Sequence, residues 1–336
     1  MLRRTKLLKN GERWEGFYYN GRDENGKRKE IPLGTDLNEA KRKWAEFEGK
    51  SATVDTSLMK HIFDRYERDI LPTKAPRTQK DNLKEFKQLR AGFDNAPVDA
   101  ITPQHIARYR DKRSAKVRAN REIALLSHVF NLAREWGYTA RENPCRGVRK
   151  NKEVPRDFYA DNAIWAAVYA CACVELKDAM DVAYLSGQRP ADVLKMRLAD
   201  IDGNAISVRQ NKTGKLLRIL LNDDAGTRTQ LGMVVDRIKS RTRKIASMHL
   251  VALPSGQPMN IYTLRSRFEA ARKAAADHAE PGLAERIRKF QFRDIRPKAA
   301  SEIADLGDAS KLLGHTDKQI TDTVYRRVGE AVKPTK

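Results

Sequence analysis

The fold of this chain is decided near its C-terminal end by three short segments: Arg293-Asp294-Ile295-Arg296, Leu313-Gly314-His315 and Thr323-Val324-Tyr325-Arg326-Arg327. A tyrosine is a weak nucleophile near neutral pH, because its phenol has a pKa of about 10. Cations make it effective by neutralising the attacked group and by helping the phenol to lose its proton. Arginine suits a phosphodiester, since its planar guanidinium stays protonated and can hold two phosphate oxygens. The stretch therefore predicts attack by Tyr325 on a DNA phosphate.

Each of these residues also has an ordinary alternative role, because a lone tyrosine usually packs and Arg-x-x-Arg in a basic protein is usually a solvated helix face. Two upstream segments favour the catalytic interpretation. They are Leu185-Ser186-Gly187-Gln188-Arg189-Pro190-Ala191-Asp192-Val193-Leu194 and Gln210-Asn211-Lys212-Thr213-Gly214-Lys215. In this order the five segments resemble the signature of the tyrosine recombinases, the lambda-type phage integrases. The resemblance covers most of the chain.

The resemblance implies a set of catalytic residues and a role for each. The set is Arg189, Lys212, Arg293, Arg296, His315 and the nucleophile Tyr325, with Asp192 placed to orient a catalytic side chain. Tyr325 would form a 3′-phosphotyrosine while two arginines hold the phosphate oxygens. Lys212 would protonate the leaving 5′ oxygen, and His315 would either donate a hydrogen bond to the phosphate or take the phenol proton. One phosphodiester replaces another, so the resemblance implies neither a cofactor nor a metal ion.

The sequence departs from the family pattern at two places. Arg293 stands where the first histidine of a His-x-x-Arg motif is usual. It lies about one helical turn before Arg296, so we expect both guanidinium groups to face the same phosphate. The interval from His315 to Tyr325 is ten residues (325 − 315), which is one more than is common in the family.

Composition favours a polyanionic partner. The 336 residues carry a net charge of +22, and 40% of them are hydrophobic, which is enough for two or three domains with real cores. An anionic membrane surface would also attract this charge, but no apolar run is long enough to span a bilayer. No secretory signal is evident, and the resemblance implies the cytoplasm of a bacterial host, at the nucleoid. The three cysteines are predicted to be buried free thiols: Cys145, Cys171 and Cys173.

Residues 1–50 are predicted to form a small α/β unit. Arg13–Tyr19 reads as a strand, turns follow at Asn20-Gly21 and Asp23–Gly26, and a second strand covers Lys27–Ile31. Asp36 and Glu39 suggest a capping box for a helix. The apolar face expected for this helix comprises Leu37, Ala40, Trp44 and Phe47. The unit resembles the arm-type DNA-binding domain of phage integrases, with DNA contacts expected from Lys27, Arg28 and Lys29. A small solubilising hairpin is the alternative.

Residues 54–146, after a polar linker at Gly49–Thr53, are predicted to be helical. One helix carries Met59, Phe63, Tyr66 and Ile70 and stops at Pro72, and others cover 77–92 and 119–136. Thr102-Pro103 is a strong helix start. The region resembles the family's helical core-binding domain, which has a SAM-like fold. Its best candidates for phosphate contacts are Lys112, Arg113, Lys116, Arg118 and Arg121.

Residues 156–336, after a basic linker at 146–156, are predicted to be a mixed α/β catalytic domain. Asp161 caps one helix, and a helix over 180–185 delivers Arg189. After a turn at 200–203, the alternation in 205–209 and 216–220 predicts a hairpin with Lys212 at its tip. Further helices are expected at 261–277 and 297–305. The whole chain is thus expected to be multidomain and mainly α, with small β-sheets.

The resemblance implies a site-specific recombinase that integrates and excises a phage or other mobile element. Its partners would be double-stranded DNA attachment sites, three further copies of itself in a tetramer on DNA, a DNA-bending host factor and an excision factor. Two alternatives stay open. One is a type IB topoisomerase-like enzyme that nicks and reseals DNA without exchanging strands. The other is a non-catalytic DNA-binding regulator derived from such an enzyme.

Overall fold

The structure is a computed structural model that describes residues 1–8, 11–22, 27–47, 58–241 and 245–327. The chain divides into two compact units, Met1–Glu153 and Val154–Lys336. The predicted linker at Gly49–Thr53 and the predicted turn at Asp23–Gly26 lie outside the described residues. Each unit is described by itself.

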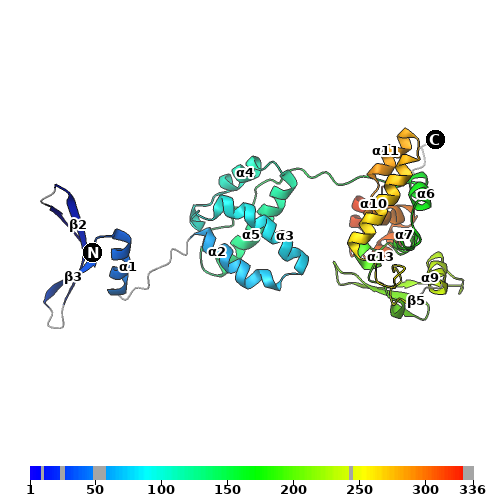
Figure 1. The fold of residues 1–336 in the computed structure, drawn as a ribbon, viewed down its shortest axis with the longest axis horizontal. Coiled ribbons are helices and arrows are strands. Elements are labelled where there is room, and N and C mark those ends of the chain that lie inside the picture. The colour runs from blue at the N-terminus through cyan, green and yellow to red at the C-terminus, as the bar shows by residue number, and fades with distance from the viewer. Residues whose placement is uncertain (9–10, 23–26, 48–57, 242–244, 328–336) are drawn as a thin grey trace. The chain divides into compact units, whose positions relative to one another are not determined.

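The first unit begins with an antiparallel sheet in the order β1-β2-β3, beside which helix α1 lies (Figure 1). The elements are β1 (Leu2–Leu7), β2 (Arg13–Arg22), β3 (Arg28–Gly34) and α1 (Leu37–Phe47). Phe17, Leu33 and Ala40 form the buried core, against which Tyr19 and Trp44 pack. Through this small hydrophobic cluster, one face of the sheet packs against α1.

Two predictions for this region were wrong in part. The sheet has a third strand, β1, whose polar sequence gave no alternation to detect. Asn20-Gly21 is not a turn, because Asn20 pairs with Glu30 inside the long strand β2. On the apolar face expected for α1, Ala40 is buried and Trp44 packs against the core, while the exposed Phe47 stacks on the ring of Tyr19 at 5.1 Å. Asp36 does cap α1, accepting from the Glu39 backbone N–H at 2.8 Å.

The rest of the first unit is helical, as predicted. Its helices are α2 (Met59–Arg65), the π-helical turn η1 (Tyr66–Ile70), the 3₁₀ turn η2 (Leu71–Thr73), α3 (Pro76–Phe93), the 3₁₀ turn η3 (Val98–Ala100), α4 (Pro103–Lys112) and α5 (Lys116–Glu135). Thr102 and Pro103 start α4, and Gly137 follows α5 with a positive φ of 79°. The buried faces of α2, α3, α4 and α5 form one separate hydrophobic cluster.

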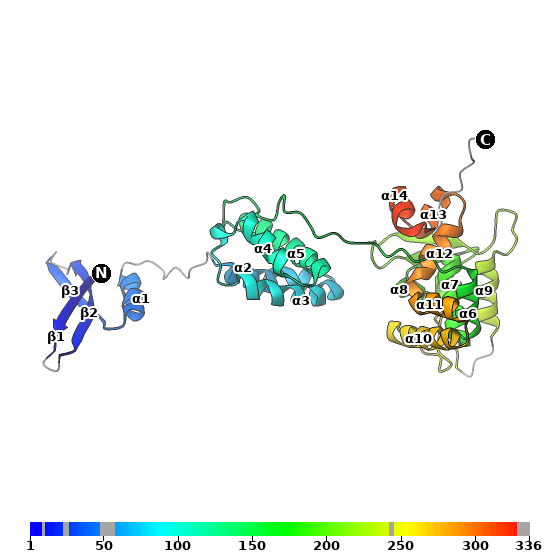
Figure 2. The ribbon, with the colours of Figure 1, turned by 90° about the horizontal axis from the view of Figure 1, so that it is seen from above.

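The second unit surrounds its own core with helices (Figure 2), and a small sheet lies along one side (Figure 1). Its helices are α6 (Asn162–Ala170), α7 (Val174–Ser186), α8 (Pro190–Val193), η4 (Leu198–Asp200), α9 (Gln230–Ser240), α10 (Ile261–Asp277), α11 (Pro281–Lys289), η5 (Phe292–Asp294), α12 (Ile295–Glu302), α13 (Leu306–Leu313), α14 (Lys318–Ile320) and the π-helical turn η6 (Thr321–Tyr325). The antiparallel sheet has the order β4-β5-β6, with strands β4 (Ile201–Asp202), β5 (Ala205–Arg209) and β6 (Leu216–Leu220).

The predicted hairpin is confirmed at both strands, and the helix capped by Asp161 begins where expected. The prediction missed α9, α11 and α13. It also placed α12 two residues late and read the short strand β4 as a turn. α11 and α13 are short, with nine and eight residues, so their apolar periodicity was too brief to detect in the sequence.

The cysteines are free, but two of them are not buried as predicted. Cys171 and Cys173 are exposed, and Cys145 is half-buried. The apolar pattern suggested one continuous helix, whereas α6 ends at Ala170 and α7 starts at Val174, so both residues lie in the connecting turn. Among the described residues, no helix combines the length and the apolar character needed to cross a membrane.

Candidate active site

The turn after α7 sets the position of Arg189. Gly187 ends the helix with φ +62°, a left-handed conformation that glycine adopts without cost. A Cβ atom there would lie 3.2 Å from side-chain carbons of Leu312 and Leu313. The turn that carries Arg189 is therefore packed directly against the turn that leads to His315.

Arg296 is buried on α12, with only 4% of its surface exposed. Its two terminal nitrogens donate to the carbonyl oxygens of Gly187 at 2.6 Å and Leu313 at 2.8 Å. Burial, reinforced by the nearby charge of Arg189, lowers the pKa of Arg296 to about 10. The guanidinium stays charged at neutral pH and joins the two turns that flank it.

His315 lies between Arg296 and Thr321. Its Nε2 is 3.1 Å from Nη2 of Arg296, and its Nδ1 is 2.7 Å from the hydroxyl of Thr321. Burial, together with the smaller effect of four nearby cations, lowers the pKa of His315 to about 4; the cations are Arg296, Arg189, Lys215 and Lys212. A guanidinium can only donate, so Nε2 accepts and the ring proton sits on Nδ1. His315 is a neutral imidazole at neutral pH.

Tyr325 ends the π-helical turn η6, and its ring packs on both of these residues. The ring centroids of Tyr325 and His315 are 4.8 Å apart, and Cζ of Arg296 lies 5.1 Å from the Tyr325 centroid. The carbonyl of Tyr325 accepts a hydrogen bond from Ser301 at 3.2 Å. The structure thus brings Arg296, His315 and Tyr325 together from three separate segments near the C-terminal end.

Two guanidinium nitrogens at this site are buried without a partner among the described residues. They are Nη1 of Arg189 and Nε of Arg296. A buried donor without an acceptor costs free energy, typically about 1–3 kcal/mol. Two such donors beside a tyrosine suit an anion with several oxygens, such as a phosphate. In the described part of the chain, no three His, Cys, Asp or Glu side chains are grouped so that they could hold a metal ion.

Lys212 lies in the exposed turn between β5 and β6. Asp192, which is 1% exposed, accepts from the backbone N–H of Asn211 at 2.8 Å, and it lies 3.4 Å from Lys195. Asp192 therefore holds the start of the lysine turn. Among the described residues its carboxylate makes no hydrogen bond to a candidate catalytic side chain, so it acts on the backbone beside Lys212 and, through its charge, on Arg296.

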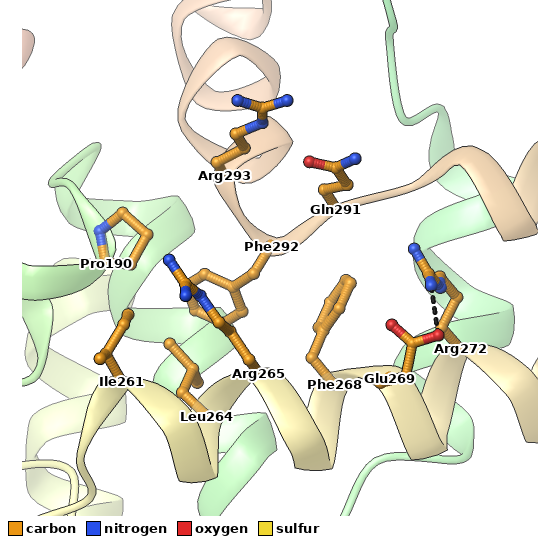
Figure 3. A pocket seen from close by; sticks show the side chains of 10 residues that line it. All are labelled: Pro190, Ile261, Leu264, Arg265, Phe268, Glu269, Arg272, Gln291, Phe292 and Arg293. Carbon is orange, nitrogen blue, oxygen red and sulfur yellow. Dashed lines mark hydrogen bonds and ion pairs between the residues drawn. The ribbon is translucent and has the colours of Figure 1, made fainter. Parts of the chain in front are cut away.

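Arg293 does not share the contacts of Arg296. It is exposed, and among the described residues it makes no hydrogen bond or ion pair. Its side chain lines a cavity of about 490 Å³. Figure 3 shows the other lining residues: Pro190, Ile261, Leu264, Arg265, Phe268, Glu269, Arg272, Gln291 and Phe292. Because η5 ends and α12 begins between Arg293 and Arg296, the two side chains are not on successive turns of one helix.

The candidate DNA-contact residues of the first unit differ in their exposure and in the hydrogen bonds that they make within the protein. Lys27, Arg28 and Lys29 are exposed at the start of β3, and Arg28 donates to Asn20 at 2.6 Å. Around α5, Lys112 and Arg118 are exposed, Lys116 donates to the carbonyl of Asp111, and Arg121 donates to Glu153.

Arg113 is the exception among these residues. It forms a two-pronged ion pair with Glu122, at 2.9 and 2.7 Å, and the Glu122 carboxylate is buried. The structure gives this guanidinium an intramolecular partner, which competes with a phosphate.

Several residues that support the site were not singled out in the sequence. They are Gln188, Gln210, Ser301 and Thr321. Gln188 and Gln210 stand within the two upstream segments that carry the resemblance, so their positions offered a signal. Ser301 and Thr321 had none, because a serine or threonine is common in any helix or turn.

Comparison with known proteins relates both units to one family. The pattern of the "Phage integrase family" matches residues 159–331, and that of the "Phage integrase, N-terminal domain" matches residues 71–152. The chain is 28% identical to the integrase of Escherichia phage HK022 over 278 residues, which is 78% of this chain and 74% of that protein. It is 27% identical to the integrase of Escherichia phage lambda over 276 residues, with the same shares covered.

Solved structures show the same fold. A lambda integrase tetramer bound to a Holliday junction is similar with a TM-score of 0.66 at 21% identity, covering 99% of this chain and 97% of that chain. A lambda integrase dimer bound to a COC′ core site is similar with a TM-score of 0.67 at 24% identity and the same coverage. At these identities the likeness concerns the fold.

Proposed function

Because this chain belongs to the phage integrase family, the family of the tyrosine recombinases, we propose that it cuts and rejoins DNA at specific sites through a covalent bond to Tyr325. One observation carries the assignment of the nucleophile. The Tyr325 ring packs on Arg296 and His315, beside two buried guanidinium nitrogens that have no partner among the described residues. Such a site offers a phenol, a proton acceptor and anion-binding donors together.

The chemical step follows from these groups. The phenol oxygen of Tyr325 attacks the phosphorus, the new P–O bond forms as the bond to the 5′ oxygen breaks, and a 3′-phosphotyrosine results. Arg189 and Arg296 hold the non-bridging oxygens, where negative charge grows in the transition state. Lys212 gives its proton to the leaving 5′ oxygen. Attack by a 5′ hydroxyl on the phosphotyrosine reverses the step and restores the phosphodiester.

His315 is the proton acceptor in this proposal. It is neutral at neutral pH because burial and its cationic neighbours lower its pKa to about 4. In the absence of DNA its Nε2 accepts from Arg296. When Nη2 of Arg296 gives to a phosphate oxygen the hydrogen bond that Nε2 now accepts, while its bonds to the two carbonyls are kept, the Nε2 lone pair becomes free for the phenol proton. The Nδ1–H, held by Thr321, keeps the ring in the tautomer that this role needs.

The domains have separate tasks in the proposal. Residues 1–50 bind arm-type sites, residues 54–146 hold the core site from one face, and residues 156–336 carry the chemistry. The lambda integrase structures contain a core site in one case and a tetramer on a Holliday junction in another, and this supports a tetramer on paired attachment sites for the present chain. We place this activity in the cytoplasm of a bacterial host, with a DNA-bending factor and an excision factor as further partners.

A trapping experiment tests the nucleophile. The DNA is a nicked duplex with a core site that the protein has selected from a random-sequence pool. The nick lets the short 5′-hydroxyl fragment diffuse away, so that the covalent complex accumulates. The wild type should form this complex, whereas Tyr325→Phe should bind the duplex equally well and form none. Tyr262→Phe is the matched control, because Tyr262 is 76% exposed on α10.

The outcome also separates the alternatives. A complex that persists in Tyr325→Phe would overturn the assignment of the nucleophile. If the wild type forms no complex on any selected site, the chain is a DNA-binding regulator without catalysis. If it relaxes supercoiled DNA but never exchanges strands between two sites, it acts like a type IB topoisomerase.

A further inference from the structure

Two buried glutamines connect the lysine turn to the histidine turn. Nε2 of Gln210 donates to Oε1 of Gln188 at 2.8 Å and to the carbonyl of Leu313 at 2.9 Å. Its Oε1 accepts from the hydroxyl of Thr213 at 2.8 Å. Both glutamines are 1% exposed. The chain of hydrogen bonds therefore runs from the residue after Lys212 to the second residue before His315.

The orientation of both amides is fixed by their partners. Nε2 of Gln188 donates to the carbonyls of Ser186 and Leu312, each at 2.9 Å. Carbonyls can only accept, so each amide must present its NH₂ group to them. All four side-chain N–H groups of the pair are then used within the protein. A buried polar network that is fully satisfied defines a single arrangement of its members.

The network also reaches the phosphate-binding arginine. The Leu313 carbonyl that accepts from Gln210 accepts from Arg296 as well, at 2.8 Å. Gly314 is required beside it, because a Cβ atom there would lie 2.8 Å from Nε2 of Gln210. The close packing leaves no room for water between the glutamine and this turn.

Lys212 is held on both sides as a consequence. Asp192 binds the backbone N–H of Asn211, the residue before it, and Gln210 binds the hydroxyl of Thr213, the residue after it. The base of the turn is closed by the backbone bonds from Gly214 to Gln210 and from Gln210 to Lys215, each 2.8 Å. The turn is thus held by hydrogen bonds at Asn211, Thr213 and Gly214, on both sides of Lys212.

We propose that Gln210, supported by Gln188 and acting through Thr213, is a positioning residue for Lys212, which it places relative to Arg296 and His315. The inference rests on the proposed function, in which Lys212 protonates the leaving 5′ oxygen. Without the network the lysine turn keeps its hairpin but loses its link to the Leu313–His315 turn. Proton donation to the leaving group should then fail more often, while the binding of DNA and the attack by Tyr325 are kept.

A pair of substrates tests this directly. Both are nicked duplexes with the selected core site, and one has sulfur in place of the 5′ bridging oxygen at the scissile phosphate. A thiolate leaves without being protonated, since thiols have a pKa of about 8.5. General acid catalysis contributes typically 10²–10⁴-fold. Single-turnover cleavage of the oxygen substrate should therefore be slowed at least tenfold in Gln210→Met and in Thr213→Val. The sulfur substrate should be cut within about threefold of the wild-type rate.

The choice of variants separates positioning from folding. Gln210→Met keeps the length of a buried side chain, whereas Thr213→Val changes an exposed residue and leaves the core intact. Thr213→Ser keeps the hydroxyl and should recover most of the rate on the oxygen substrate. Thr227→Val is the matched control, because Thr227 is an exposed threonine in the turn at 223–227. Rate loss in Thr227→Val equal to that in Thr213→Val would overturn the proposal.

Lys212→Ala on the same two substrates tests the proposed function separately. If sulfur rescues neither Lys212→Ala nor the network variants, Lys212 is not the general acid. If sulfur rescues Lys212→Ala but leaves Gln210→Met and Thr213→Val slow, Lys212 keeps its role and the positioning proposal is wrong. Unchanged cleavage of the oxygen substrate by Thr213→Val would also overturn it.

Discussion

At the scale of single residues, the site is defined by donors that lack an acceptor. Arg296 has three side-chain nitrogens, of which two bind carbonyls of neighbouring turns and one, Nε, has no partner among the described residues. Nη1 of Arg189 is likewise buried and has no hydrogen-bond partner among the described residues. The carbonyl bonds hold the Arg296 guanidinium in place before DNA arrives, so little reorganisation is needed when charge develops. Residues with this preorganisation should dominate the reaction rate.

Arg293 and Arg296 should therefore differ strongly. Arg296→Ala should lose nearly all single-turnover cleavage, and it also removes the bonds that join two turns. Arg293 is exposed and lacks these bonds, so Arg293→Ala should lose only part of the activity and Arg293→His should keep much of it. Loss of one transition-state donor typically costs roughly 3 kcal/mol, or about a hundredfold, which is the upper limit for Arg293.

The measurement is cleavage of the nicked duplex at saturating protein, with folding checked by circular dichroism. Arg265→Ala is a matched control, since Arg265 lines the same cavity (Figure 3). Wild-type cleavage by Arg293→Ala would reduce Arg293 to a surface charge. A variant as inactive as Arg296→Ala would put the assignment of the second catalytic arginine in doubt.

The neutral imidazole of His315 should make the second unit sensitive to acid. In the unfolded chain a histidine takes up its proton near pH 6.5, whereas burial and cationic neighbours lower the folded pKa of His315 to about 4. Between these values the unfolded state binds more protons, so stability falls as the pH falls.

Thermal unfolding of wild type and His315→Gln from pH 8 to pH 4 measures this effect. Glutamine does not titrate, so the difference between the two melting temperatures should drift in favour of the variant as the pH is lowered below 6.5. A constant difference over this range would mean that His315 titrates alike in the folded and unfolded states.

At the scale of elements, the sequence predicted those helices and strands whose residues show a strong local pattern. The hairpin of β5 and β6, the start of α4 at Thr102-Pro103 and the long helix α5 were all foreseen from alternation, capping residues and apolar spacing. The order of the motifs predicted Arg189, Arg296, His315 and Tyr325 as catalytic residues, and their catalytic roles stay a prediction. The glutamine network could not be derived, because its members are more than a hundred residues from the Leu313 turn and only packing joins them.

The π-helical turn η6 shows how an element positions Tyr325, the proposed nucleophile. Ser301 of α12 donates its hydroxyl proton to the carbonyl of Tyr325 at 3.2 Å and accepts from the backbone N–H of Arg327 at 2.9 Å. Arg327 in turn donates to the carbonyl of Phe158 at 2.6 Å and lies 3.5 Å from Asp294. The carboxylate of Asp294 also binds Arg156 through two hydrogen bonds. The segment around Tyr325 is therefore tied to the body of the second unit.

Removal of the Ser301 hydroxyl should loosen this segment. It deletes two hydrogen bonds, each with a net contribution of about 1 kcal/mol, so Ser301→Ala should slow single-turnover cleavage roughly tenfold. DNA affinity should stay within about twofold, because no phosphate contact is removed. Ser240→Ala is the control, since Ser240 makes one exposed bond to Arg237 at the end of α9. Cleavage by Ser301→Ala at the wild-type rate would show that the position of Tyr325 is set by other contacts.

At the scale of the whole molecule, the positive charge is divided unequally between residues 1–50 and the rest of the chain. Residues 1–50 contain 13 Lys and Arg and 9 Asp and Glu, a net charge of +4 (13 − 9), which leaves +18 (22 − 4) for residues 51–336. Binding to DNA releases counterions in proportion to the phosphates contacted, so affinity falls steeply as salt rises. Because most of the positive excess lies after residue 50, most of this salt dependence should lie there too.

A protein that starts at Ser51 should therefore bind and cleave an isolated core site almost as well as the full chain. The log–log slope of its affinity against salt should stay close to that of the full chain on the same site. The sheet of β1, β2 and β3 has its own core of Phe17, Leu33 and Ala40, separate from that of the helical region, so its removal leaves the helical core intact. What should be lost is recombination that depends on a second class of DNA site.

Integration is measured between two plasmids, one carrying a full attachment site and the other a core site. The matched control is a full-length chain with Lys27, Arg28 and Lys29 changed to Gln, which keeps the fold of the sheet but removes three exposed cations. Both proteins should cleave core sites and fail to integrate. If the truncated protein integrates as well as the full chain, the sheet is a solubilising unit. If only the truncation fails, the sheet acts through a surface other than these three cations.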